Sequence, residues 1–157
     1  LGVSIYSLKE FNKIKEYKKI NCAQIPFNIL DYKWEKILNL KHRNFKIFVR
    51  SMFIRGNLSN DNINFPKNTN KYQNLIHDLN TLVKKFKKRD LFELSISYIK
   101  SFKGINYYIF GVQNESHLKK NLNYFKTQPL KKNEKKKIMI TVKKYFSQKN
   151  ADLRNWK

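Results

Sequence analysis

The sequence has little cysteine, proline or glycine: its 157 residues include one cysteine, three prolines and four glycines. The single thiol, Cys22, can build neither a disulfide framework nor a zinc site made of cysteines, and it favours a reducing, intracellular compartment. Long apolar runs are also missing, since stretches such as Ile47–Val49 are far too short to span a bilayer. No basic and then apolar leader is visible. We therefore expect a cytoplasmic protein, and the start at Leu1 instead of Met suggests that an N-terminal part is missing.

Acidic residues are scarce as well, with 11 against 34 basic residues and a net charge of +23. Such a charge usually indicates nucleic acid or an anionic membrane as a partner. The basic residues, however, are 29 lysines and only 5 arginines, accompanied by 20 asparagines and 16 isoleucines, which is the profile of an A/T-rich coding sequence. Proteins that read bases use the planar fork of arginine on guanine. The composition thus favours no specific nucleic-acid partner, although attraction to polyanions at low salt is expected.

Apolar periodicity predicts a chain in which strands and helices alternate. The sequence is 41% hydrophobic and 15% aromatic, enough for the core of one domain. Ser7 and Glu10 form a capping-box pattern, and the polar stretch 57–70 is predicted to be a long loop. The predicted strands are 2–6, 22–26, 45–50 and 106–111. The segments with helical spacing are 8–17, 32–40, 72–86, 91–102, 115–125 and 134–146.

This alternation predicts parallel strands joined by right-handed crossovers. Two architectures fit the order, a doubly wound sheet and part of a (β/α) barrel. The sequence has no G-x-G-x-x-G, which weighs against a doubly wound dinucleotide fold, and it has neither a P-loop nor a G-x-S-x-G motif. The three histidines lack metal-binding spacing, so we expect no metal site and place His42 and His77 on the solvent side of helices.

Two stretches at strand ends are candidates for ligand binding. Gly111–Ser116 lies where a strand gives way to a helix, a junction whose free N–H groups suit a phosphate, and the alternative is a tight bend that Gly111 permits. Arg50–Gly56 leaves a strand and opens the long loop, so it is either a ligand-covering loop or a surface excursion. Ser4 and Gln24 are polar residues in apolar strands, where each is hydrogen-bonded structurally or directed at a ligand.

Four segments, in chain order, resemble the second half of an aldo-keto reductase. Gly2–Ser7 resembles the fifth barrel strand, which reads G-V-S in many members, and Gln24–Asp31 resembles the sixth strand, where one bacterial branch has a Q-x-P-x-N-x-x-D-like stretch. Val49–Leu58 is similar to the seventh strand and loop of that branch, and Phe110–Leu122 to the eighth strand and the helix after it. Together the four segments cover nearly the whole chain.

The resemblance implies an α/β fold of the (β/α)8 TIM-barrel type, of which residues 1–157 would form the C-terminal half: about four parallel strands with helices on one side. It also implies NADP(H) as the cofactor, with NAD(H) as the alternative, extended across the C-terminal face of the strands. Ser4 and Gln24 would bind the nicotinamide carboxamide. Arg50 stands where many members carry a Tyr that stacks on the nicotinamide ring, and a guanidinium can stack as well. The loop residues that would line the pyrophosphate path are Ser51, Phe53 and Gly56.

At the other end of the cofactor, the resemblance places Gly111 at the strand-to-helix junction, followed by Gln113 and Asn114 at the 2′-phosphate and the adenosine ribose. His117 and Asn121 would approach the adenine. Many members carry Arg, Lys or Ser at position 113, so a neutral Gln113 weakens the preference for NADPH over NADH.

The catalytic Asp, Tyr, Lys and His of the family belong to the second to fourth strands, so no catalytic residue is assigned in this chain. The expected function is the cofactor-binding half of an NAD(P)H-dependent reductase of aldehydes or ketones, inactive by itself. The alternatives are a non-catalytic truncated barrel that binds a phosphorylated ligand or a partner chain, and a basic polyanion-binding protein that uses the lysines of 131–144. Two open sheet edges and an exposed apolar inner face would favour self-association.

Overall fold

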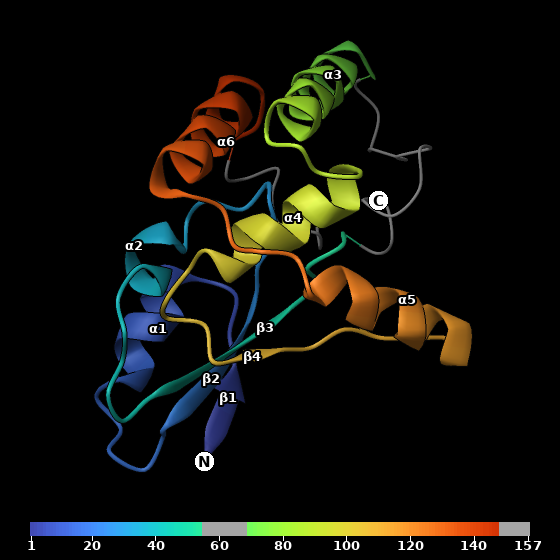
Figure 1. The fold of residues 1–157 in the computed structure, drawn as a ribbon. Coiled ribbons are helices and arrows are strands. Elements are labelled where there is room, and N and C mark those ends of the chain that lie inside the picture. Colours follow the sequence, from blue (N-terminus) through green and yellow to red (C-terminus); the bar gives the residue numbers. More distant parts are fainter. Residues whose placement is uncertain (55–68, 148–157) are drawn as a thin grey trace.

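The structure is a computed structural model and describes residues 1–54 and 69–147 (Figure 1). Strands alternate with helices through the first half of the chain, and helices dominate the second half. The elements in chain order are β1 (Gly2–Ser4), α1 (Leu8–Ile14), β2 (Cys22–Pro26), α2 (Glu35–Leu38), β3 (Lys46–Arg50), α3 (Thr69–Lys85), α4 (Leu91–Lys100), β4 (Tyr107–Tyr108), α5 (Glu115–Phe125) and α6 (Lys132–Tyr145).

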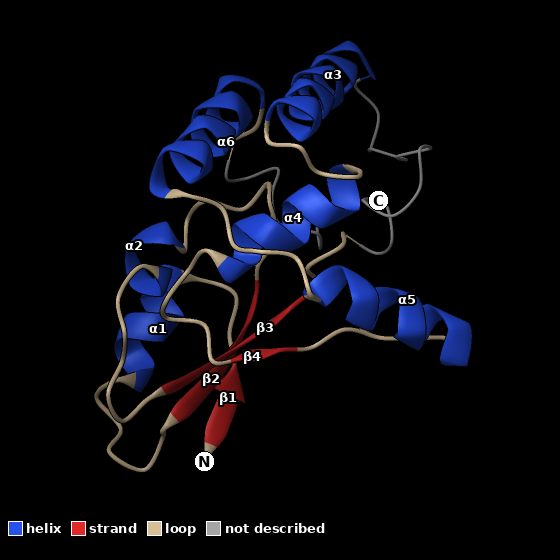
Figure 2. Ribbon diagram, viewed as in Figure 1, coloured by secondary structure: helices blue, strands red, loops and turns tan. Residues whose placement is uncertain are grey.

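The four strands form one parallel sheet in the order β1-β2-β3-β4 (Figure 2). Ser4 is level with Gln24 across β1 and β2, and Pro26 is level with Arg50 across β2 and β3. Sequential order with parallel pairing is the arrangement of consecutive strands in a (β/α) barrel and not that of a doubly wound sheet, which reverses its order. The predicted half-barrel of four strands is therefore confirmed.

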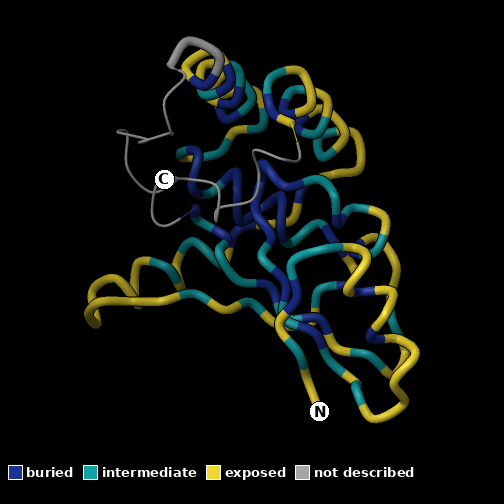
Figure 3. The backbone as a smooth tube through the Cα atoms, turned by 180° about the vertical axis from the view of Figure 1, so that it is seen from behind, coloured by how far each residue is buried: buried dark blue, intermediate teal, exposed yellow. Residues whose placement is uncertain are grey.

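Burial alternates along the central strands and separates the two faces of the sheet. Ala23, Ile25, Ile47 and Val49 are at most 1% exposed, whereas their neighbours in β2 and β3 are partly exposed or exposed. The buried face packs against the helices in one hydrophobic core that also contains Phe11, Trp34, Leu38, Tyr98 and Phe102. The helices thus cover one face, and the other face, which would be the interior of a closed barrel, is left accessible (Figure 3).

That accessible face is more polar than expected. Phe48 on β3 and Tyr107 on β4 give it an aromatic patch, with their rings stacked at 4.5 Å. Beside them, Ser4, Gln24 and the exposed Lys46 alternate with the buried positions. The inner face is therefore mixed, because every second residue of these short strands is about as often polar as apolar.

Most predicted elements are present, and the differences are at their ends. The helix predicted over 32–40 is only Glu35–Leu38, and the strand predicted over 106–111 is only Tyr107–Tyr108. Beyond Ile109, whose N–H donates to the carbonyl of Val49, the chain leaves the sheet. Of the predicted loop 57–70, residues 57–68 lie outside the described residues, and Thr69 and Asn70 begin α3. The capping box of Ser7 and Glu10 is formed as predicted.

The prediction for His42 was wrong. His42 lies in the connection between α2 and β3, not on a helix, and it is half-buried. Its Nε2 is 3.1 Å from the carbonyl oxygen of Ile37, and its ring packs edge-on against Phe11 and Phe45. His77, in contrast, is an exposed residue of α3, as predicted. In the described ranges, no helix is both long enough and apolar enough to cross a membrane.

Replacing Tyr98 with Phe should stabilise the chain. The Tyr98 hydroxyl is fully buried and has no hydrogen-bond partner among the described residues, and burial raises its pKa far above the ordinary value. An unpaired buried hydroxyl keeps its desolvation cost, so its removal should raise the free energy of unfolding by about 1 kcal/mol. Urea denaturation followed by circular dichroism measures this change, with Tyr17→Phe at an exposed position as the neutral control. A fall in stability would indicate an unseen partner of the hydroxyl.

Candidate active site

Two polar side chains lie side by side at the carboxyl end of β1. Ser4 and Gln24 are partners in the parallel register of β1 and β2, so their side chains point to the same face of the sheet. Ser4 is exposed and Gln24 is half-buried. Among residues 1–54 and 69–147, neither side chain has a hydrogen-bond partner. The hydroxyl and the amide are therefore available to a ligand, which favours the ligand-directed alternative over the structural one.

Arg50 lies on the same face, at the end of β3. It is two residues beyond Phe48, which is the register partner of Gln24. The Arg50 guanidinium lies over the ring of Tyr6, 4.7 Å from the ring centroid, and its Nη1 donates to the Ser51 hydroxyl at 3.3 Å. Such stacking fixes a long side chain in one orientation and presents a flat surface beside the strand ends.

Tyr6 is a further residue of this face that was not predicted from the sequence. Tyr6 follows Ser4 by two positions, so the period of a strand already places both side chains on one face. That periodicity is the signal that could have identified it. Its partner Arg50, 44 positions further along the chain, becomes visible only in the tertiary structure.

The turn after β3 holds two residues in the left-handed backbone region. Ser51 has φ 57° and Ile54 has φ 51°, and the Ile54 N–H donates to the Ser51 carbonyl at 3.3 Å. A β-branched residue rarely adopts this conformation, which costs on the order of 1–2 kcal/mol. Ile54 tolerates it because its side chain is buried in the core. Strain of this kind is concentrated at binding loops.

Phe53 and Gly56 are the other two loop residues that were predicted to line the pyrophosphate path. Phe53 is half-buried, and its ring packs on Phe92 at 4.2 Å and near Phe110 at 6.4 Å. The ring therefore belongs largely to the packing between the β3 turn and α4. Gly56 lies outside the described residues.

The remaining predicted residues lie on a projecting segment, the α5 arm, which we define as residues 109–125. It runs out from β4 and returns as α5 (Figures 1 and 3). Asn114 is the N-cap of α5, and its side-chain oxygen accepts the N–H of His117 at 2.9 Å. Asn121 is half-buried on α5. Four predicted residues of the arm are exposed: Gly111, Gln113, Asn114 and His117.

The backbone at position 111 makes no tight bend that would require a glycine. Its φ lies outside the left-handed region, and a Cβ added there would meet nothing within 4 Å. The structural alternative for this glycine is therefore unsupported, and the open space above it leaves room for a ligand.

The predicted residues thus form two sets rather than one cluster. Ser4, Gln24 and Arg50 share the sheet face at the strand ends, and the residues of the α5 arm lie beyond the β4 edge of the sheet. An extended ligand could touch both sets, whereas a compact one could touch only one. Within the described ranges, no group of three or more His, Cys, Asp or Glu side chains could hold a metal ion.

Comparisons with known proteins agree with this geometry. The aldo-keto reductase AKR11C1 from Bacillus halodurans, in its holo form, superposes with a TM-score of 0.73 at 19% identity, over 95% of this chain and 52% of that one. The glycerol dehydrogenase AKR11B4 from Gluconobacter oxydans superposes with a TM-score of 0.67 at 19% identity, over 92% of this chain and 49% of that one. No curated protein matches significantly. The two coverages show that this chain spans about half the length of these two solved structures, which share its fold.

The sequence itself gives the assignment. A family model described as the aldo/keto reductase family matches residues 1–142. That match includes all four strands, the strained turn after β3 and the whole α5 arm. This chain belongs to the aldo/keto reductase family.

Proposed function

We propose that this chain provides the cofactor-binding part of an NAD(P)H-dependent oxidoreductase that reduces an aldehyde or a ketone. The observation that carries the proposal is the pairing of Ser4 and Gln24, two polar side chains in register on the open face of a parallel sheet, with no hydrogen-bond partner among the described residues. Ligands of such sheets bind at the carboxyl ends of the strands. Family membership supports oxidoreductase chemistry with a nicotinamide cofactor, and the chain supplies a donor set that suits it.

The roles follow the chemistry of the groups. A carboxamide needs a hydrogen-bond donor and an acceptor, which the Ser4 hydroxyl and the Gln24 amide supply together. The stacked Arg50 and Tyr6 offer a flat surface for an aromatic ring beside them. When bound, the reduced nicotinamide supplies the hydride of the reaction, while the protein orients it. Ser51, Phe53 and Gly56 would line the pyrophosphate path.

The α5 arm would hold the adenosine end. The exposed N–H groups at the start of α5 and the positive end of its dipole favour a phosphate near Gly111 and Gln113. The side-chain oxygen of Asn114 caps the helix, so its amide NH2 is the group that would donate to a ligand. His117 and Asn121 lie one and two turns further along α5, where they would meet the adenine.

Protonation of the carbonyl oxygen would need residues other than residues 1–157. The resemblance assigns the proton-donating Tyr and its Lys, Asp and His neighbours to strands that precede the segment matched here. We therefore propose that residues 1–157 bind and orient the cofactor and that turnover requires a second segment, in the same or another chain, that carries those residues. The carbonyl substrate would bind between the two.

Titration of the full chain with NADPH, followed by cofactor fluorescence, tests the proposal. We expect saturable binding that Gln24→Ala weakens roughly 10-fold, the loss of one well-placed hydrogen bond to a bound group. Gln73→Ala, at an exposed position of α3, is the matched control and should bind as the unmodified chain does. The absence of saturable NADPH and NADH binding, or equal affinities of the two variants, would contradict the proposal.

A further inference from the structure

In the described residues, the interactions of helix α5 with the rest of the molecule come from its C-terminal end, and the chain before it leaves the sheet at Ile109. Helix α5 has no buried residue, and its apolar residues Leu118 and Leu122 are 38% and 52% exposed. In its last turn, Phe125 lies 5.4 Å from Tyr108 of β4 and stacks at 5.1 Å on Phe110, a residue of the arm itself. The direction in which α5 points is therefore set by the groups that hold this turn.

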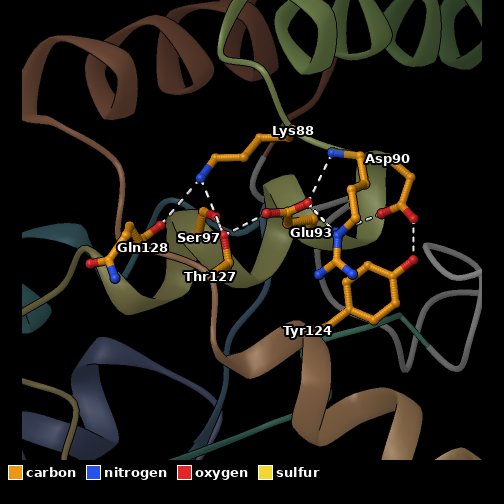
Figure 4. Close-up of polar contacts among 8 residues, drawn as sticks. Lys88, Asp90, Glu93, Ser97, Tyr124, Thr127 and Gln128 are labelled. Atoms are coloured by element: carbon orange, nitrogen blue, oxygen red, sulfur yellow. Dashed lines mark hydrogen bonds and ion pairs between the residues drawn. The ribbon is translucent and has the colours of Figure 1, made fainter.

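Tyr124 is held from three sides by residues at the start of α4, and Figure 4 shows its hydroxyl bonded to Asp90. Its hydroxyl donates to Oδ2 of Asp90, which raises the pKa of Tyr124 to about 12. The Arg89 guanidinium lies over the ring at 4.1 Å, and Phe92 packs edge-on at 4.8 Å. A tyrosine with a hydrogen bond, a cation and an aromatic edge around it has little rotational freedom.

The residues that hold Tyr124 are themselves fixed. Oδ1 of Asp90 caps α4 by accepting the N–H of Glu93 at 2.8 Å, so the carboxylate bridges the start of α4 to the end of α5. Arg89 Nε donates to Glu93 Oε2 at 2.8 Å. Burial would raise the pKa of Glu93, but hydrogen bonds from Arg89 and Thr127 outweigh it and keep that pKa below its ordinary value. Arg89 and Glu93 are therefore held in place by hydrogen bonds and are charged at neutral pH.

A lysine from the other end of α4 holds the carbonyls at the end of α5. Lys100 Nζ donates to the Phe125 carbonyl at 2.6 Å and to the Thr127 carbonyl at 2.7 Å. Partial burial lowers the pKa of Lys100 from its ordinary value. A cation at a helix C-terminus satisfies carbonyls that have no partner within the helix and complements the helix dipole. Residues at both ends of α4 thus bind the C-terminal end of α5.

We propose that Tyr124 and Lys100 are positioning residues that aim the α5 arm at the adenosine end of the cofactor. The inference rests on the proposed function, which places that end of the cofactor at Asn114 and His117. A helix of 11 residues is about 16 Å long, so a rotation of about 10° at its anchored end displaces its first turn by roughly 3 Å. A displacement of that size breaks a hydrogen bond.

The test compares Tyr124→Phe and Lys100→Met with the unmodified full chain. Two probes divide the cofactor: 2′,5′-ADP carries only the adenosine end, and reduced nicotinamide mononucleotide only the nicotinamide end. We expect each variant to weaken 2′,5′-ADP and NADPH roughly 10-fold and to leave the mononucleotide within about 2-fold. The matched controls Tyr17→Phe and Lys9→Met, at exposed positions, should change neither affinity. Hydrogen exchange should become faster in the amides of α5 and stay unchanged in β2 and β3.

The outcomes separate the two proposals. If the unmodified chain binds none of the three probes, the proposed function fails, and hydrogen exchange alone then decides whether Tyr124 and Lys100 hold α5. If the unmodified chain binds NADPH and both variants keep its affinity, the positioning role is overturned while the proposed function stands. An equal loss of 2′,5′-ADP and of the mononucleotide also overturns it, because general damage to the fold would then account for the change.

Discussion

Gly104→Ala should lower the free energy of unfolding by about 3 kcal/mol. Gly104 lies in the connection between α4 and β4, and its N–H donates to the Leu38 carbonyl at 2.8 Å. A Cβ at this position would be 2.4 Å from the carbonyl oxygen of Leu40 and 2.9 Å from that of Leu38. Both atoms are backbone, so no side chain can rotate away and the connection itself must move.

Gly111→Ala is the matched control for this substitution. A Cβ at Gly111 meets nothing within 4 Å, so the change in stability should stay within about 0.5 kcal/mol. Urea denaturation of both variants, followed by circular dichroism, measures the difference. Equal stabilities of the two variants would show that the backbone of Leu38–Leu40 moves aside for the added Cβ without lowering the free energy of unfolding. Gly111→Ala is also informative in the NADPH titration, since any loss of affinity then reports the close approach of a ligand.

Phe102→Ala should have a comparable effect, a loss of about 3–5 kcal/mol. Phe102 is 2% exposed and joins α4 to the sheet: its ring is 5.0 Å from that of Phe27 and 5.1 Å from that of Tyr98, both edge-on. The Lys135 ammonium from α6 lies over the same ring at 4.2 Å. Removing the ring opens a cavity at the meeting point of β2, α4 and α6, which rigid neighbours cannot fill.

The consequence of Phe102→Ala reaches the candidate site. Phe27, the main partner of Phe102, follows β2, and its N–H donates to the Arg50 carbonyl at 2.9 Å. This bond ties the end of β2 to the end of β3, where Arg50 begins the strained turn. We therefore expect weaker NADPH binding to accompany the loss of stability. Phe102→Leu should cost less than about 1.5 kcal/mol, and Tyr107→Ala, at a half-exposed position, less than about 1 kcal/mol. Equal effects of all three substitutions would contradict this account.

Local signals account for the parts of the fold that were predicted correctly. Ala23 and Ile25 in β2, like Ile47 and Val49 in β3, repeat with the period of a strand, and the capping box that begins at Ser7 marks the first turn of α1. Each of these signals acts within a few residues, so it can be recognised without knowing what packs against the segment. The alternation of such segments was enough to predict a parallel sheet with crossover helices.

Contacts between distant segments explain the errors and omissions. His42 was expected on a solvent-facing helix because its neighbours in sequence are polar, but Phe11 and Phe45 enclose its ring. The C-terminal limit of β4 depends on its partner, because β3 ends at Arg50, one residue beyond the partner of Tyr108. Neither the ring contact nor the pairing partner is encoded within the segment itself.

By itself, the sequence determined the type and order of the elements and the membership of the chain in its family, because periodicity, caps and motif spacing are properties of neighbouring residues. Only the tertiary structure decided that Arg50 stacks on Tyr6, that Ser4 and Gln24 stand in register with no hydrogen-bond partner in the described part of the chain, and that α4 holds α5 by its last turn. These arrangements join residues 20 to 44 positions apart, and their energies come from packing, desolvation and charge in a shared environment. No local pattern carries that information.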